Sequence, residues 1–314
     1  MGAPLCDTLF NPNRVALLGF GEAGSTLARG LKGTWCNHNN NSRRVLAVDI
    51  ALGKGPRGKS MEALARELDV DISGHYTAVL GKAAVVISVV TGDQAIHAAQ
   101  AAKPWLSPGS YYLDFNSITG PQTCDVAAVF DQSEIHFIDV AVMGGFEALG
   151  IEVPLLLAGL EATIINDWMN RTGFTARVLA TRVGDASAVK ILRSVMVKGI
   201  EALSVECLVA AHRQNLVREV LDNLGDIDRQ GFAGFIETLT TTHLVHAKRR
   251  MEEVEKAAMN LRDTGIEPLM TEATRRSHLR TCEARVAPSD GTKPTLDEAL
   301  NILSSKVIKS MDYR

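Results

Sequence analysis

A glycine-rich turn near the N-terminus constrains the fold of this chain more than any other feature. A short apolar run leads into Gly19-x-Gly21-x-x-Gly24, and a helical pattern follows at residues 25–31. Gly19 permits a tight turn, Gly21 lets a pyrophosphate approach the backbone, and Gly24 lets the helix pack closely on the strand. The pattern therefore predicts a strand, a turn and a helix whose N-terminus offers N–H donors to phosphates.

An acidic residue ends the next predicted strand, because Asp49 closes the run at residues 45–49. A carboxylate at this position binds both ribose hydroxyls of an adenosine and repels a 2′-phosphate, so the sequence favours NAD over NADP. Lys54, Arg57 and Lys59 follow closely and are the competing partners for a 2′-phosphate. Alternatively, the glycines only ease packing and Asp49 merely ends a strand. The residues predicted to bind the dinucleotide are Gly19, Phe20, Gly21, Glu22, Ala23, Gly24, Asp49, Val90 and Thr91.

The first half of the chain alternates apolar runs with helical patterns, which is typical of a doubly wound parallel sheet. Strands are predicted at residues 15–19, 45–49, 85–89, 111–114, 137–140, 155–158 and 177–180, and helices between them include 25–31, 61–68 and 93–102. Beyond Gly184 a long helix is predicted from residue 185 to about 220, followed by helices near 232–239, 243–262, 268–280 and 296–309. We therefore expect a Rossmann α/β domain over residues 1–182 and an all-α domain for substrate binding and dimerisation over residues 183–314.

Composition and charge exclude several classes of function. The 314 residues carry a net charge of −3, which argues against nucleic-acid binding, and the apolar stretches are shorter than the roughly 18 residues of a membrane span. Residues 1–13 lack the features of a signal peptide, and the five cysteines are scattered and odd in number. We therefore expect a cytoplasmic protein with reduced thiols.

His243 and His246 have no nearby carboxylate ligand, so no metal site is predicted.

Two further strand ends carry groups that suit a nicotinamide or a substrate. Asn116 and Ser117 follow the strand at residues 111–114 and offer small hydrogen-bonding side chains. Gly144 and Gly145 follow the strand at 137–140 and expose backbone N–H groups that suit a carboxylate. Ordinary turn chemistry is the alternative interpretation of both segments.

The long helix is apolar on nearly every face, which predicts that it is largely buried. Lys190, Ser194 and Lys198 nevertheless recur at i, i+4 and i+8 on one side of it, with Arg193 adjacent. Such a cationic stripe on a buried helix should face a water-filled cleft, and a desolvated lysine has a lowered pKa suited to acid–base work. The alternative is a solvated helix face on which the lysines extend into water.

Taken together, these segments resemble the β-hydroxyacid dehydrogenase superfamily over most of the chain. The glycine fingerprint matches, residues 114–121 look like the family's Asp-x-Ser-Thr-x-x-Pro segment with one residue more, and Asp139 with the glycine pair looks like its substrate segment. The catalytic-lysine segment is matched by Gly184 and Lys190 at the family's spacing. The run from Gly184 to Gly199 is similar to a little-characterised, 6-phosphogluconate dehydrogenase-like branch with a distinct helical C-terminal domain.

The resemblance implies an NAD(P)-dependent dehydrogenase or reductase that acts on the CH–OH group of a small hydroxy acid or related polyol, and a homodimer. Met143 stands where the family usually has a serine, and Arg193 and Ser194 replace paired asparagines. An imine reductase is the first alternative, against which retention of Lys190 counts, and a non-catalytic dinucleotide-binding protein is the second. By the resemblance, Lys190 is the general acid/base and the substrate contacts are Asn116, Ser117, Gly144, Gly145, Arg193, Ser194 and Lys198.

Overall fold

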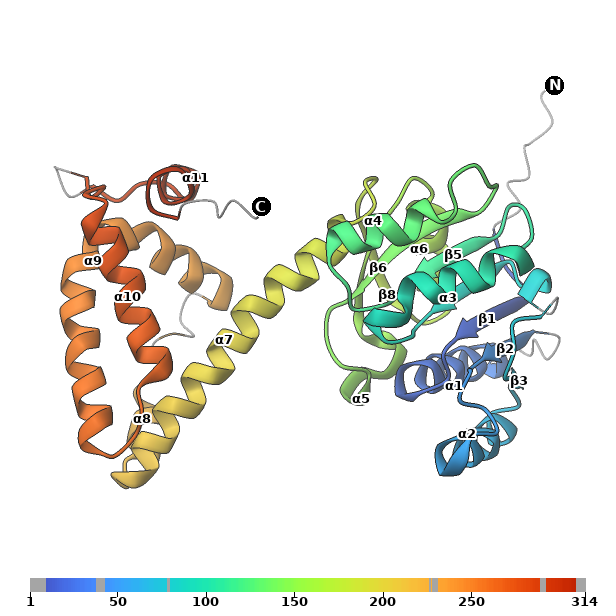
Figure 1. Ribbon diagram of the computed structural model, residues 1–314, viewed down its shortest axis with the longest axis horizontal. Helices are drawn as coiled ribbons and strands as arrows, with labels where there is room; N and C mark the ends of the chain where they lie inside the picture. The colour runs from blue at the N-terminus through green and yellow to red at the C-terminus, as the bar shows by residue number, and fades with distance from the viewer. Residues whose placement is uncertain are drawn as a thin grey trace. The chain divides into compact units, whose positions relative to one another are not determined.

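The computed structural model describes residues 10–37, 43–77, 80–225, 227, 231–288 and 292–308. The chain divides into two compact units, Met1–Ser194 and Val195–Arg314 (Figure 1). This division falls inside the long helix α7 (Asp185–Arg213), whereas the sequence places the domain boundary ahead of that helix. The interpretation of the N-terminus as lacking a signal peptide rests partly on residues 1–9, which lie outside the described residues.

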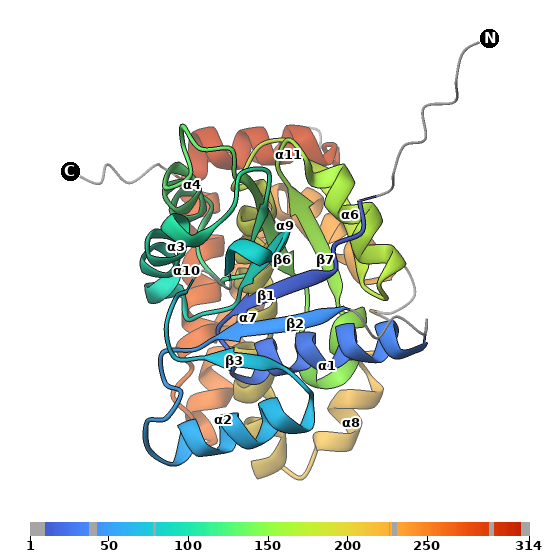
Figure 2. The ribbon, with the colours of Figure 1, turned by 90° about the vertical axis from the view of Figure 1, so that its right-hand side faces the viewer.

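The first unit is built on an eight-stranded sheet in the order β3-β2-β1-β4-β5-β6-β7-β8 (Figure 2). Neighbouring strands run parallel except for β6 and β7, which pair antiparallel and were predicted to be parallel. The short connection between them explains this difference, because only parallel neighbours require a long crossover. The strands are β1 Arg14–Leu18, β2 Arg44–Val48, β3 Asp71–Ser73, β4 Val85–Ser88, β5 Tyr111–Asp114, β6 His136–Val142, β7 Pro154–Ala158 and β8 Thr175–Ala180.

Helices cover both faces of this sheet, as the predicted doubly wound architecture requires. Val15 and Leu17 of β1 belong to the apolar cluster on one face, and Ala16 and Leu18 to the cluster on the other. A strand buried on both sides must be apolar at every position, which is why these strands read as continuous apolar runs. The helices are α1 Glu22–Asn37, α2 Gly55–Glu67, α3 Ala95–Ala102, α4 Gly120–Ala128, α5 Phe146–Leu149 and α6 Ala162–Arg171, with one-turn 3₁₀ segments at Leu80–Lys82, Gly92–Gln94, Lys103–Trp105 and Gly150–Glu152.

The second unit is helical, as predicted, but its helices have different bounds. The long helix α7 ends at Arg213 rather than near residue 220, because Asn215 adopts a left-handed φ of 57° that terminates it. The two helices predicted at 232–239 and 243–262 form a single helix, in which the hydroxyls of the intervening threonines bond to carbonyls of the preceding turn. The elements are α7, α8 Val217–Asp222, α9 Gly231–Asp263, α10 Leu269–Glu283, α11 Leu296–Ile302 and a π-helical turn at Leu303–Val307.

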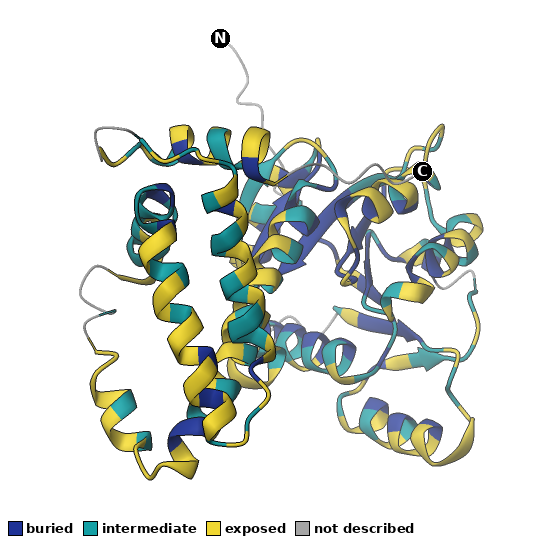
Figure 3. Ribbon diagram, turned by 60° about the vertical axis from the view of Figure 1, so that its left-hand side comes forward, coloured by how far each residue is buried: buried dark blue, intermediate teal, exposed yellow. Residues whose placement is uncertain are grey.

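The prediction that α7 is largely buried is wrong for the single chain. Leu192 and Val195 are 69% and 70% exposed, and Val205 is 60% exposed. An apolar helix can be covered by its own chain or by another molecule, and the residue pattern alone does not distinguish the two. Buried positions in Figure 3 concentrate on the strands, whereas helices of the second unit are exposed over much of their length.

Membrane-spanning helices and grouped metal ligands are both absent from the described residues. None of the helices in this part of the chain combines the length and apolar character needed to cross a bilayer. Within the same residues, no three or more His, Cys, Asp or Glu side chains are grouped so as to hold a metal ion.

Candidate functional site

The turn after β1 has the geometry that the glycine pattern predicts. Gly19 adopts a φ of 96°, and a Cβ there would lie 2.7 Å from the carbonyl oxygen of Val89. A Cβ on Gly24 would lie 2.2 Å from the carbonyl oxygen of Gly19, so α1 starts directly against the turn. At Gly21 the nearest atom to such a Cβ is an Arg57 nitrogen at 3.7 Å. Gly19 and Gly24 are thus required by the fold, and Gly21 leaves the turn open toward Arg57.

Asp49 is held in place at the carboxyl end of β2. Its Oδ2 accepts a hydrogen bond from the Phe20 N–H at 2.9 Å, and its Oδ1 accepts one from the Ala51 N–H at 2.9 Å. The carboxylate therefore ties the glycine turn to the β2 exit and sits beside it in a fixed orientation. Tyr76 lies near this carboxylate, and the pKa of its phenol is raised by burial and by the charge of Asp49.

These groups line a cavity of about 450 Å³ at the carboxyl ends of the strands, where ligands bind in open α/β sheets. Of the residues predicted to bind the dinucleotide, Gly19, Gly21, Asp49, Val90 and Thr91 line it, while Phe20, Glu22, Ala23 and Gly24 shape the turn and the first residues of α1. The fit to a dinucleotide rests on an open glycine turn, a helix N-terminus and a fixed carboxylate. Lining residues that the sequence analysis did not select are Val48, Ile50, Ala51, Tyr76, Val89, Gln94, His97, Ala98 and Ala101.

Asn116 connects this cavity to the next strand. Its side-chain Oδ1 accepts from the Val90 N–H at 2.8 Å, and its Nδ2 donates to Ser88 Oγ at 3.0 Å. The residue is only 3% exposed. The structure therefore places Asn116 behind the cavity wall, where it orients the loop after β4. Its contact with substrate stays a prediction.

Lys190 and Ser117 lie together, although they are 73 residues apart. The Lys190 Nζ donates to Ser117 Oγ at 2.7 Å. The loop after β4 adjoins the same segment, because a Cβ on Gly92 would be 3.0 Å from the Ser117 carbonyl oxygen. The predicted catalytic lysine is thus placed beside a loop that contributes Val89, Val90 and Thr91 to the cavity wall.

The start of α7 is anchored on a buried carboxylate. Asp139 accepts hydrogen bonds from the Gly184 N–H at 3.0 Å, from the Ser187 N–H at 3.1 Å and from Ser187 Oγ at 2.7 Å. Thr123 on α4 donates to Ser187 Oγ at 3.0 Å. Gly184 has a φ of 94°, so the chain enters the helix through a left-handed residue. These contacts place Lys190 about one turn beyond the anchored N-terminus.

Burial lowers the proton affinity of Lys190, in spite of two nearby carboxyl groups. Burial lowers the pKa of the Lys190 amine, while the carboxyls of Asp114 and Asp139 oppose that effect. Burial also raises the pKa of Asp114 to about 7. An amine with a lowered pKa beside a hydroxyl can serve as a general acid or base.

The remaining predicted substrate residues are less closely grouped. Gly144 and Gly145 are exposed in the loop that follows β6. Arg193 is exposed, and Ser194 Oγ donates to the Lys190 carbonyl oxygen at 3.0 Å within the helix. Lys198 forms an exposed ion pair with Glu201 at 2.9 Å. None of these contacts tests the predicted roles.

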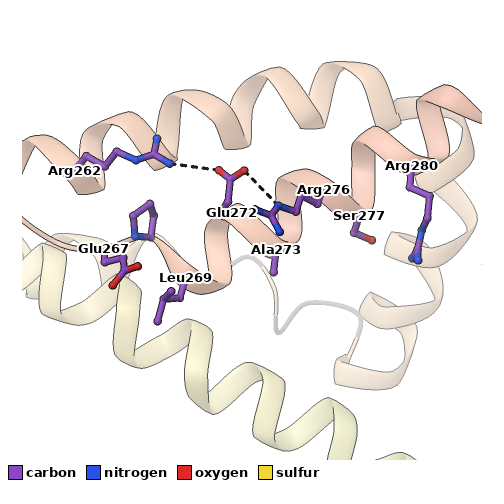
Figure 4. A pocket seen from close by; sticks show the side chains of 9 residues that line it. Arg262, Glu267, Leu269, Glu272, Ala273, Arg276, Ser277 and Arg280 are labelled. Carbon is purple, nitrogen blue, oxygen red and sulfur yellow. Dashed lines mark hydrogen bonds and ion pairs between the residues drawn. The ribbon is translucent and has the colours of Figure 1, made fainter.

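A second cavity, of about 640 Å³, lies in the helical unit between α9 and α10. Three of its charged side chains form ion pairs: Glu272 lies 3.4 Å from Arg262 and 3.7 Å from Arg276 (Figure 4). None of the residues predicted to bind cofactor or substrate lines this cavity. Nearby, His243 Nε2 is 2.8 Å from Thr281 Oγ1, and its ring packs on His278.

Comparison with known proteins agrees with this arrangement. Residues 14–163 match the family model of the NAD binding domain of 6-phosphogluconate dehydrogenase, and residues 211–280 match a domain of unknown function, DUF1932. A solved conserved protein of unknown function, described as structurally similar to 3-hydroxyacid dehydrogenases, is 30% identical; the match covers 89% of this chain and 99% of that one, with a TM-score of 0.56. The chain belongs to the β-hydroxyacid dehydrogenase superfamily.

More distant relatives of this superfamily member extend the likeness of fold. An uncharacterised 28.5 kDa protein of Methanothermus fervidus is 23% identical over 271 residues, which cover 86% of this chain and all of the relative. An imine reductase from a Pseudomonas species is 14% identical, covers 94% of this chain and 100% of its own, and has a TM-score of 0.73. At that identity the comparison shows a shared fold.

The sequence analysis assigned no role in the site to several polar residues that the fold brings there. Ser88, Asp114 and Asp139 are aligned in register across β4, β5 and β6 and are each at most 2% exposed. A polar side chain at the end of an otherwise apolar strand was the available signal. Thr123 and Ser187 gave no comparable signal, because their contact depends on how α4 and α7 meet.

Proposed function

We propose that this β-hydroxyacid dehydrogenase superfamily member is an NAD(P)-dependent oxidoreductase that interconverts the hydroxyl and carbonyl of a small hydroxy acid or related polyol. The observation that carries the proposal is the hydrogen bond between Lys190 and Ser117, beside the loop that lines the dinucleotide cavity. A desolvated amine and a hydroxyl in this position form a proton-transfer pair.

The bound nicotinamide would supply or accept the hydride, and the residues of this chain would manage the proton and the orientation of the substrate. In the oxidative direction, Lys190 accepts the proton of the substrate hydroxyl. In the reductive direction, it donates a proton to the carbonyl oxygen. Ser117 holds the Lys190 amine by their 2.7 Å bond and orients it toward the substrate.

We favour NAD as the cofactor because the Asp49 carboxylate is fixed in the cavity wall. Both of its oxygens accept backbone N–H bonds, so the side chain cannot turn away from a 2′-phosphate without losing them. Arg57 also lines the cavity, whereas the wall includes neither Lys54 nor Lys59. Calorimetric titration with NADH and NADPH tests the preference. Tighter binding of NADPH would indicate that Arg57 binds the 2′-phosphate and that Asp49 does not select the cofactor.

The proposed chemistry is tested by replacing Lys190 with Met. We expect kcat/KM to fall by about 10²–10⁴-fold toward a hydroxy acid found in a screen, since this is the usual contribution of a general acid or base. The dissociation constant for NADH should stay within twofold of the wild-type value.

Lys248→Met, which removes an exposed lysine on α9, is the matched control and should retain activity. Turnover of an imine but of no hydroxy acid would instead support the reductase alternative, and near-normal activity of Lys190→Met would refute the assignment.

We also propose that the protein functions as a homodimer. The support is the exposed apolar surface of α7, where Leu192, Val195 and Val205 are each at least 60% exposed. Exposed apolar side chains of this kind are typical of an interaction site, and a second copy of the chain would cover them.

A further inference from the structure

A row of buried polar side chains crosses the sheet close to the Lys190 segment, because Lys190 bonds to Ser117, three residues after Asp114, and Asp139 bonds to Ser187, three residues before Lys190. Ser88, Asp114 and Asp139 occupy matching positions on three adjacent parallel strands, so their side chains share one face of the sheet. Asp114 and Asp139 are 2% and 0% exposed. Two carboxyl groups thus sit side by side in a region from which water is largely excluded.

The carboxyl groups of Asp114 and Asp139 differ in the number of hydrogen bonds that they accept. Asp139 accepts three hydrogen bonds from Gly184 and Ser187 at the start of α7, which stabilise its charged form. Asp114 accepts one, from the Asn116 N–H to its Oδ1 at 2.9 Å, and its Oδ2 has no hydrogen-bond partner within the described part of the chain. Of the two neighbours, Asp114 is therefore the one that binds a proton more readily.

The charged and titratable groups around Asp114 come from three elements. Asp139 on β6 opposes its ionisation, and Lys190 on α7 favours it. Tyr112 lies on the same face of β5, and burial raises the pKa of its phenol, so it stays neutral at physiological pH. Helix α4 contributes the neutral Thr123 next to Ser187. Lys190 is accordingly the cation whose charge responds to Asp114.

We propose that Asp114 is a positioning residue whose proton occupancy is thermodynamically coupled to that of Lys190, so that each group gains a proton more readily when the other has lost one. This inference deepens the proposed function, because it rests on Lys190 as the acid–base group. When Lys190 gives its proton to a carbonyl oxygen, its positive charge disappears, and Asp114 takes up one proton from the bulk solution, which is the proton that the reduction consumes overall. The pair then passes from a carboxylate and an ammonium to a carboxylic acid and an amine, and its net charge stays zero.

The coupling can be measured on the ligand-free protein, without any substrate. Carbon-13 labelling of lysine Cε and of aspartate Cγ allows the two groups to be titrated by NMR, with Lys190→Met and Asp114→Asn identifying their signals. In Asp114→Asn we expect the pKa of Lys190 to fall by about one unit, because a nearby carboxylate that favours the ammonium is lost. In Lys190→Met we expect the pKa of Asp114 to rise by the same amount, because coupling is reciprocal.

Ser88→Ala is the matched control, since it removes the neutral neighbour of Asp114 in the same row and should leave the pKa of Lys190 unchanged. An Asp114→Asn shift no larger than that of Ser88→Ala would overturn the proposal. Should Asp114→Asn fail to fold, an unchanged Asp114 titration in Lys190→Met would overturn it equally. If Lys190→Met loses turnover but the pKa values of Asp114 and Lys190 are not coupled, the proposed function stands and the coupling proposal fails. If the two pKa values are coupled but the wild-type protein turns over no hydroxy acid, the coupling stands and the proposed function fails.

Discussion

The two units of this chain bury apolar surface in different ways. In the sheet unit, Leu17, Ile87 and Leu113 are fully buried together with most of their neighbours, and both faces of the sheet are covered by its own helices. In the helical unit, the buried apolar residues of the described part are mostly small, and Phe232 and Leu269 are more than half exposed. The sheet unit therefore buries its apolar surface within itself, whereas the helical unit leaves much of its apolar surface exposed, and we expect it to depend on a covering surface.

The sharpest test of the self-contained sheet unit is Gly19→Ala. The left-handed φ of Gly19 and the 2.7 Å approach of its Cβ position to the Val89 carbonyl leave no room for a methyl group. We expect the free energy of unfolding to fall by about 2–4 kcal/mol, as for strain at a backbone position that excludes side chains. Urea denaturation of the cofactor-free protein measures it.

Gly21→Ala is the control for that variant, because the nearest atom to its Cβ position is 3.7 Å away. It should unfold at nearly the wild-type urea concentration but bind NADH at least tenfold more weakly, since the added methyl blocks the approach of the pyrophosphate. Equal destabilisation by the two substitutions would mean that the turn is not the rigid element that the structure implies.

The sheet could be predicted because its signals are local. Strands such as β4 and β5 are continuous apolar runs, and the glycine turn specifies its own backbone geometry. The short edge strand β3, with the sequence Asp-Ile-Ser, carries no such pattern, and it pairs because β2 offers a free edge. The strand β7 was predicted, but its antiparallel direction was not, since direction depends on the path of a connection rather than on composition.

The site was only partly predictable, because its geometry depends on contacts between distant segments. Lys190 could be selected from its spacing after Gly184, and Ser117 from its place after a strand. Their mutual hydrogen bond depends on how the first turn of α7 is anchored to Asp139 of β6. This long-range contact has no local pattern in the sequence. The role of Asn116 in holding Val90 likewise arises from the alignment of β4 with β5.

The dependence of the helical unit on a covering surface is tested by Val195→Asp. Val195 is 70% exposed, so the substitution should leave the fold of a monomer intact while placing a charge in the proposed dimer interface. We expect the dimer dissociation constant to rise about 100-fold or more by sedimentation equilibrium. Glu201→Gln, at an exposed polar position of the same helix, should change it little. A monomeric wild-type protein would remove this explanation of the exposed helix.

A gentler test uses pH, to which the two units should respond in opposite directions. Burial raises the folded-state pKa of Asp114 to about 7, so the folded sheet unit binds a proton that the unfolded chain has released. Its stability should therefore fall as the pH rises from about 4 to 7. Burial and the charges of nearby basic groups lower the folded-state pKa of His243 to about 4, so the unfolded chain binds more protons there. The stability of the helical unit should therefore fall as the pH drops from about 6.5 to 4.

Hydrogen exchange resolved by segment measures the two responses separately, because strands β4 to β6 report the sheet unit and helices α9 and α10 report the helical unit. We expect roughly 1–2 kcal/mol across each window, since one pKa unit corresponds to about 1.4 kcal/mol. Asp114→Asn should flatten the response of the strands alone, and His243→Gln that of the helices alone. Parallel loss of protection in both units at both pH extremes would show that they unfold as one cooperative structure, and the contrast between a self-contained unit and a dependent one would then fail.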